Sequence, residues 1–164
     1  MTLTLRSPAF PDRGQIPGQY TCDGANTSPP LQWSHVPAGT QSLALIMEDP
    51  DAPDPKAPTH TFVHWVIYNL PPSPESLAED RPVPVGARQG ANDGKTIGYI
   101  GPCPPIGRHR YFFKLYALDT MLGDLSTPTK RALEAAIREH VLEHAELVGL
   151  YERGQVGAGR RQRQ

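Results

Sequence analysis

Five side chains in two segments of the chain have the chemistry for proton transfer or for binding an anion. They are Asp49, Asp51, His64, His109 and Tyr111. Carboxylates, imidazoles and phenols exchange protons and form hydrogen bonds, so such a cluster suits acid–base catalysis or an anion site. His109 and Tyr111 are two residues apart, which places them on one face of a β-strand. Each residue taken alone is more simply explained as core packing or a turn cap, and only the fold can bring the two segments together.

Two histidines and a carboxylate are also suitable ligands for zinc or iron. However, the sequence lacks the His-x-His and His-Glu-x-x-His spacings of compact metal sites. It also has no Gly-x-Ser-x-Gly, phosphate-loop or dinucleotide-binding motif. We therefore expect no catalytic residue, no metal and no cofactor. The alternative is a hydrolase or metal-dependent enzyme that uses the same cluster.

Two apolar runs flank Asp49 and Asp51. Residues 42–47 form a continuous apolar run that is typical of a central strand, and residues 61–70 are rich in β-branched and aromatic side chains. Between them, four prolines lack an amide hydrogen and predict a stiff loop instead of a strand: Pro50, Pro53, Pro55 and Pro58. In the second strand, a period of two predicts one shared face for Phe62, His64, Val66 and Tyr68.

The second segment, residues 98–118, begins as a glycine- and proline-rich loop and continues as a strand. Glycine lets a ligand approach backbone N–H groups closely. Counting by two along the strand places on one face His109, Tyr111, Phe113, Leu115 and Ala117. Shorter strands are expected at residues 2–5, 19–22 and 31–33, with a long surface excursion at 73–98.

The last quarter of the chain predicts a helix. Thr127 and Pro128 are suited to the N-cap and the first helical position, and an apolar stripe continues to about Val148, before Gly149. His140 and His144 would border the buried face of this helix. Residues 150–151 would then form a short edge strand.

The composition is that of a globular protein with many ordered loops. Hydrophobic residues make up 38% of the 164 residues and charged residues 20%, with 15 glycines and 19 prolines. The formal net charge of −1 argues against nucleic acid and membrane surfaces as partners. The sequence shows neither a signal-peptide pattern nor a membrane-spanning apolar run, so we expect a cytoplasmic protein without integral membrane association.

One domain is expected over residues 1–153, followed by a flexible tail over residues 154–164. The chain has two cysteines, Cys22 and Cys103, which are too few for a disulfide scaffold and lack Cys-x-x-Cys spacing. Reduced thiols are therefore the default expectation, and a single disulfide is the alternative.

Several separated motifs occur along most of the chain: YTCDGANTSPPLQW at 20–33, DPDAP at 49–53, HWVIYNLP at 64–71, GPCPPIGRHRYFFKLYALD at 101–119 and ELVGLYER at 146–153. In this order they resemble the phosphatidylethanolamine-binding protein family, and in particular its bacterial, Raf kinase inhibitor-like branch. The resemblance spans about residues 2–153. It implies a mainly β fold, an antiparallel Greek-key β-sandwich with peripheral helices and a C-terminal helix.

The resemblance also implies a pocket for a small anion such as phosphate, acetate or a phosphorylated head group. By motif, its ligand-binding residues would be Asp49, Asp51, His64, Gly101, His109 and Tyr111. The neighbouring Arg110 looks like a structural partner for one of the carboxylates. The expected function is non-enzymatic binding that modulates a protein partner such as a kinase or protease, and a homodimer is expected.

An anion beside two carboxylates needs compensating charge. Our hypothesis is that His64 and His109 supply donors and partial positive charge, that Tyr111 donates its hydroxyl, and that Asp49 orients an imidazole or is neutralised by Arg110. Anion binding should then strengthen as the pH falls through the histidine range. A purely structural protein with a vestigial pocket would bind no anion at all.

Overall fold

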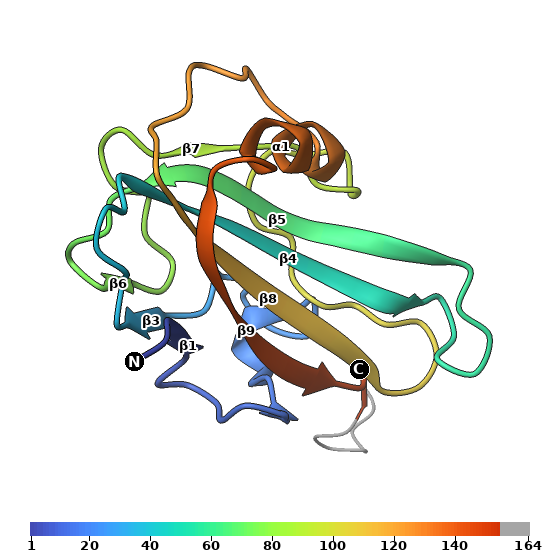
Figure 1. Cartoon of the computed structure of the whole chain (residues 1–164). Helices are drawn as coiled ribbons and strands as arrows, with labels where there is room; N and C mark the ends of the chain where they lie inside the picture. The colour runs from blue at the N-terminus through green and yellow to red at the C-terminus, as the bar shows by residue number, and fades with distance from the viewer. Residues whose placement is uncertain (155–164) are drawn as a thin grey trace.

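The computed structural model describes residues 1–154 and consists of two β-sheets and one α-helix (Figure 1). The larger sheet has the order β2-β9-β8-β4-β5-β7, and the smaller sheet has the order β1-β3-β6. The strands are β1 (Thr4–Arg6), β2 (Gly14–Gln15), β3 (Leu31–Ser34), β4 (Ser42–Ala52), β5 (His60–Leu70), β6 (Ser76–Leu77), β7 (Arg88–Gln89), β8 (His109–Leu118) and β9 (Val141–Tyr151). The helix α1 spans Lys130–Ile137, and a 3-10 turn spans Gly18–Tyr20.

The long strands form the centre of the larger sheet. β4 lies between β5 and β8 and is antiparallel to both, and β8 is antiparallel to β9. The short strand β2 is parallel to β9. Nearly every residue of β4 is buried, as the continuous apolar run predicts for a central strand. The predicted mainly β fold is confirmed.

The larger sheet separates two apolar clusters. One cluster packs against β1, β3 and the N-terminal loops and includes Trp33, Met47 and Phe113. The other packs under α1 and includes Ile46 and Leu133. Neighbouring residues of β4 therefore face opposite layers, and the site below lies at the end of the first layer. Within the described residues 1–154, no helix has the length and apolar character to cross a membrane.

Several predicted elements are confirmed, but the proline loop is shorter than expected. β4 continues through Asp49 and Asp51 to Ala52, so the loop covers only residues 53–59. Asp49 pairs with Phe62 and Ala52 with His60, which leaves an extra residue on β4 at a bulge. A bulge tolerates a proline because its amide hydrogen is not needed in the ladder.

Two smaller predictions change in detail. The expected strand at residues 19–22 is wrong, because the 3-10 turn occupies this position. Residues 73–98 are largely irregular as expected, but they contain the short strands β6 and β7 and no helical turn.

The predicted long C-terminal helix is wrong. The helix α1 covers eight residues, and its N-cap is Thr129, whose Oγ1 accepts a hydrogen bond from the backbone N–H of Ala132 at 3.1 Å. The expected helical residues after 140 form β9, which pairs with β8 from Val141 to Tyr151. Apolar residues in this stretch match a period of two as well as a helical period, and the open edge of β8 selects the strand. His144 therefore lies on a strand, with its side chain exposed.

A bulge in β5 corrects the predicted face of that strand. Met47 pairs with Trp65 and Glu48 with Val63, so His64 is an extra residue opposite β4. Beyond the bulge, Val66 and Tyr68 face the cluster under α1 and not the side of His64. The predicted face of β8 is confirmed, since its alternate residues from Tyr111 to Ala117 belong to one cluster.

The predicted boundary at residue 153 stays a prediction. Residues 155–164, most of the expected tail, lie outside the described part of the chain.

Candidate ligand-binding site

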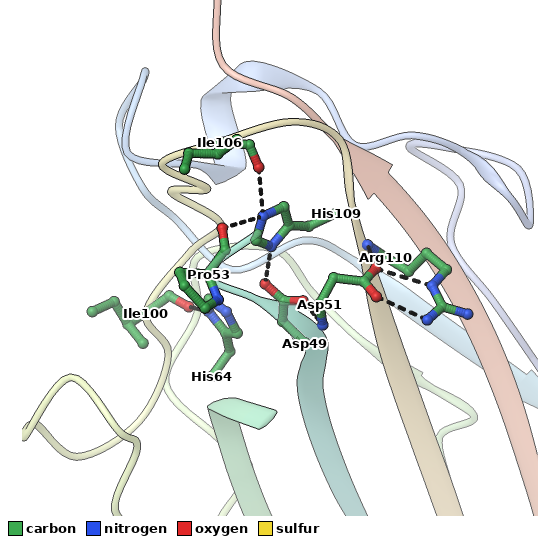
Figure 2. A network of polar contacts seen from close by, with 8 residues as sticks. All are labelled: Asp49, Asp51, Pro53, His64, Ile100, Ile106, His109 and Arg110. Carbon is green, nitrogen blue, oxygen red and sulfur yellow. Dashed lines mark hydrogen bonds and ion pairs between the residues drawn. The ribbon is translucent and has the colours of Figure 1, made fainter. Parts of the chain in front are cut away.

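Asp49 and His109 form a buried pair at the ends of β4 and β8 (Figure 2). The His109 Nδ1 atom lies 2.6 Å from Asp49 Oδ2, and both side chains are almost fully buried. The His109 Nε2 atom lies 2.9 Å from the carbonyl oxygen of Ile106 and 3.1 Å from that of Pro53. Carbonyl oxygens only accept hydrogen bonds, so Nε2 carries a hydrogen. A second proton must then lie between Nδ1 and the carboxylate.

The Asp49–His109 pair thus carries no net charge, whichever partner holds the shared proton. Burial raises the pKa of Asp49, and hydrogen bonds from His109 and from the backbone N–H of Asp51 partly offset this effect. A neutral pair repels an anion far less than a free carboxylate would. Both ring nitrogens of His109 are bonded within the protein, so its contribution to the site is to fix Asp49 and two loops.

Asp51 has a different partner although it lies only two residues from Asp49. It accepts hydrogen bonds from Arg110, at 3.0 Å from Nε, 2.8 Å from Nη2 and 2.9 Å from the backbone N–H. The hydrogen bonds from Arg110 lower the pKa of Asp51. The predicted role of Arg110 as a structural partner is confirmed, and Asp51 is not among the residues that line the cavity described below.

His64 has one free nitrogen. Its Nδ1 donates to the carbonyl oxygen of Ile100 at 2.7 Å, and the backbone N–H of Ile100 donates to the His64 carbonyl oxygen at 3.1 Å (Figure 2). Burial lowers the pKa of His64 to about 4. The ring is therefore neutral at pH 7, and Nε2 is an acceptor with no hydrogen-bond partner among residues 1–154.

Tyr111 lies beneath these histidines. Its ring packs edge-on against His64 at 5.3 Å between centroids and stacks on His109 at 6.3 Å. Its hydroxyl group is buried and has no hydrogen-bond partner in the described part of the chain, and burial raises its pKa. Tyr111 therefore packs against both imidazoles and is not among the residues that line the cavity.

A cavity of about 400 Å³ opens beside the Asp49–His109 pair. Its lining residues are Cys22, Asn26, Asp49, Ala52, Pro53, His60, Phe62, His64, Ile100, Gly101, Cys103, Pro104, Pro105 and His109. Most of this wall is apolar, with a few polar side chains among the lining residues, which is the usual composition of a small-molecule site. No lysine or arginine is among the lining residues.

Asn26 is a polar residue of the cavity that the sequence does not single out. Its Oδ1 accepts the backbone N–H of Gly101 at 3.0 Å, so this N–H is already bonded within the protein. The side-chain amide of Asn26 is left as a donor at the cavity. A Cβ atom on Gly101 would lie 2.3 Å from Asn26 Oδ1, so glycine is required for this close approach. No spacing in the sequence connects residues 26 and 101.

Cys22 and Cys103 form a disulfide, so the default expectation of reduced thiols is wrong. Their Cα atoms are 5.4 Å apart, although the residues are 81 positions apart in the sequence. The fold brings together two loops that no local motif relates. Both cysteines line the cavity.

Comparison with known sequences identifies the family. The sequence profile described as phosphatidylethanolamine-binding protein matches residues 6–152. The chain belongs to the phosphatidylethanolamine-binding protein family. A family member from Methanothermobacter thermautotrophicus, named UPF0098 protein, is 51% identical over 156 residues, which are 93% of this chain and 100% of the relative. A UPF0098 protein from Chlamydia pneumoniae is 45% identical over 92% of this chain and 99% of its own. These names assign no activity.

Solved structures of the family share the fold. A phosphatidylethanolamine-binding protein homologue from Chlamydia trachomatis is 43% identical, with a TM-score of 0.87 over 93% of this chain and 98% of the homologue. YbcL from Escherichia coli is 31% identical, with a TM-score of 0.83 over 93% of this chain and 99% of YbcL. A carboxypeptidase Y inhibitor, solved with its cognate proteinase, is 20% identical with a TM-score of 0.59 over 92% of this chain and 83% of the inhibitor chain, which shows a common fold alone.

Proposed function

We propose that this family member is a non-enzymatic protein that binds a small anion in the cavity beside His64. The observation that carries the proposal is the set of polar groups that line that cavity. Among residues 1–154, His64 Nε2 and the Asn26 amide have no hydrogen-bond partner and are available to a ligand, while the only lining carboxylate of these residues, Asp49, is neutralised by His109. His109 and Tyr111 contribute by holding Asp49 and His64 in position.

The cavity wall favours a singly charged ligand with an apolar part. Within residues 1–154 no lysine or arginine lines the cavity, so no basic side chain of the described part balances a second negative charge. Neutral His64 accepts a hydrogen bond from an anion that keeps its own O–H, such as a singly protonated phosphomonoester. An apolar group next to the phosphate would lie against Phe62, Ile100 and Pro105. The phosphate and the two methylene groups of a phosphoethanolamine head group have this chemistry, and its ammonium group balances one negative charge.

Binding should strengthen as the pH falls, over a lower pH range than the ordinary pKa of histidine predicts. The pKa of His64 in the free protein is about 4, and a bound anion stabilises the imidazolium and raises this pKa. Affinity therefore increases as the pH falls from the pKa of the complex down to about 4, and levels off below it. Asp93 and His109 are the charged groups that act on the pKa of His64. His60 is a second histidine in the cavity lining, so the variant His60→Asn serves as the background in which the pH dependence is measured for His64.

Calorimetric titration tests the proposal. We expect saturable binding of O-phosphoethanolamine, stronger at pH 5 than at pH 7, because the phosphate takes up its second proton at about pH 6 and His64 protonates more readily in the complex. Dimethyl phosphate should bind more weakly because it has no O–H, and since its charge is constant over this range its pH dependence isolates the contribution of the protein. His64→Ala should weaken O-phosphoethanolamine binding by about tenfold, the effect of one lost hydrogen bond to a charged group. The matched control is His144→Ala, an exposed histidine on β9 that does not line the cavity. Affinity that stays constant or rises with pH would contradict the proposal.

We propose that ligand occupancy modulates contact with a protein partner, a kinase or a protease, in the cytoplasm. The carboxypeptidase Y inhibitor and its proteinase show that one protein of this fold binds a protease. A homodimer is also proposed, and light scattering would measure it.

The enzyme alternative predicts stoichiometric metal and phosphatase or esterase turnover that His64→Ala abolishes. Among residues 1–154, no group of three or more His, Cys, Asp or Glu side chains is arranged to hold a metal ion.

A further inference from the structure

The Cys22–Cys103 disulfide is part of the cavity wall and is open to solvent. Both cysteines line the cavity, and both residues are exposed. The bond joins the loop of residues 21–26 to the loop of residues 101–108, and the second loop alone supplies Gly101, Cys103, Pro104 and Pro105 to the lining. A soluble thiol can therefore reach the one covalent link between the two sides of this wall.

The outer part of the second loop has few other attachments. Between residues 102 and 107, the described structure gives two hydrogen bonds to the rest of the protein. The carbonyl oxygen of Pro102 accepts the backbone N–H of Cys22 at 3.1 Å, and that of Ile106 accepts His109 Nε2 at 2.9 Å. The disulfide lies between these two points and fixes the middle of the segment.

The inner part of the wall is held independently of the disulfide. Gly101 donates its N–H to Asn26, and the Tyr99 hydroxyl donates to the carbonyl oxygen of Tyr20 at 2.6 Å. The strands β4, β5 and β8 do not depend on the disulfide for their pairing. Loss of the bond should therefore free the outer wall while the sheet and the base of the cavity stay folded.

We propose that the Cys22–Cys103 disulfide is a reducible clasp on the cavity, so that thiol–disulfide exchange at this site sets ligand affinity. The effect on affinity rests on the proposed anion-binding function. In the oxidised protein, the wall is ordered before the ligand arrives. In the reduced protein, the ligand must order residues 102–107 itself, and this cost lowers affinity.

A dithiol reductant supplies the electrons. One of its thiolates attacks the Sγ atom of Cys22 or Cys103 and forms a mixed disulfide, and the other cysteine leaves as a thiolate that takes up a proton. The second thiol of the reductant then attacks the reductant's own sulfur in the mixed disulfide and releases the remaining cysteine as a thiolate, which also takes up a proton. Two protein thiols and one oxidised reductant result, with two electrons transferred. Reducing compartments favour the open clasp and oxidising compartments favour the closed one.

Two measurements on the full chain test the clasp, before and after treatment with dithiothreitol. The first is amide hydrogen exchange at Cys22, whose N–H bonds to Pro102, with Leu133 in α1 as the internal control. We expect at least tenfold faster exchange at Cys22 on reduction and no change at Leu133. The second is calorimetric titration with O-phosphoethanolamine, and we expect at least tenfold weaker binding after reduction, because fixing even one or two of residues 102–107 costs about that much free energy.

The matched control is the double variant Cys22→Ser with Cys103→Ser. It should behave as the reduced protein does in both measurements and should not respond to dithiothreitol. Unchanged exchange at Cys22 would overturn the clasp, and so would equal affinity of the oxidised and reduced proteins. If the oxidised protein binds no probe, the proposed anion-binding function fails, and the exchange measurement still decides whether the disulfide orders the wall.

Discussion

At the scale of single residues, position decides the role of identical side chains. Asp49 and Asp51 lie on the same strand end, but Asp49 is buried against an imidazole and Asp51 faces a half-exposed guanidinium. His64 and His109 differ in the same way. His109 uses both ring nitrogens within the protein, and His64 keeps one for the cavity. A list of ligand-type residues therefore contains both contact residues and residues that hold them.

Asp49→Ala should destabilise the protein by about 3 kcal/mol, because it leaves His109 Nδ1 and the backbone N–H of Asp51 without a partner in a buried site. Asp51→Ala is the matched comparison. It should cost about 1 kcal/mol, since the Arg110 side chain is 50% exposed and water can replace the lost bonds. Urea unfolding measures both variants, and equal losses would contradict the assigned difference in environment.

At the scale of elements, β9 and α1 determine how the larger sheet is completed. β9 pairs with β8 over the whole length of β8. α1 covers one face of the larger sheet, and the smaller sheet packs on the other face. Gly149 lies in β9 where the sheet meets Ile16 and Phe10. Glu48 links three elements, since it lies on β4 and bonds Lys114 of β8 and Lys130 of α1.

Gly149→Ala should destabilise the protein by about 1–3 kcal/mol through overpacking. The added Cβ would lie 2.5 Å from Ile16 Cγ1 and 3.0 Å from Phe10 Cε2, both in the buried core. Gly123→Ala is the control, because its Cβ would meet no atom within 4 Å. Thermal unfolding of the two variants checks the prediction, and equal stability of Gly149→Ala and Gly123→Ala would contradict it.

Glu48→Gln should cost about 2 kcal/mol at pH 7, because two partly buried lysines lose their partner. Burial raises the pKa of Glu48, but hydrogen bonds from Lys130 and Lys114 outweigh this effect and lower the pKa below 4.5. A lowered pKa means that the carboxylate stabilises the fold above pH 4.5 and that this stability is lost as the pH falls through the folded-state pKa. Urea unfolding of both proteins from pH 7 to pH 3 should show the difference shrinking below pH 4.5. A constant difference would exclude the ion pairs as its cause.

At the scale of the whole molecule, the site is a meeting point of separate parts of the chain. The cavity draws residues from the loop near Asn26, the end of β4, the start of β5 and the loop before β8. A ligand that contacts all four parts binds the folded state and not the unfolded chain. Ligand binding and global stability are therefore linked.

O-phosphoethanolamine should raise the unfolding temperature of the whole chain. At a concentration of about 100 times Kd, binding adds roughly 2.7 kcal/mol to the free energy of unfolding. Differential scanning calorimetry measures the shift, which should fall to about half in His64→Ala, because a tenfold weaker Kd leaves roughly 1.4 kcal/mol at the same ligand concentration, and which should be retained in His144→Ala. A shift of equal size in His64→Ala would place the ligand outside this cavity.

The sequence alone determined the local features of this protein. The run at 42–47 predicts β4 because a strand that is buried on both faces is apolar throughout, and the run at 61–70 predicts β5 because it is rich in β-branched and aromatic residues. The spacing of His109 and Tyr111 places both side chains on one face of β8, and the separated motifs indicate the family. These features depend on neighbours in the sequence, or on motif order, and need no knowledge of long-range contacts.

Only the tertiary structure decided the long-range pairings. Residues 141–151 fit a helix or a strand equally well until the edge of β8 selects the strand. The disulfide between Cys22 and Cys103, and the bond from Gly101 to Asn26, join residues that no spacing relates. The β5 bulge at His64 and the environments of Asp49 and Asp51 likewise depend on which partner each strand end meets. Hydrogen-bond partners and burial set the protonation of the site, and both arise only when the chain is folded.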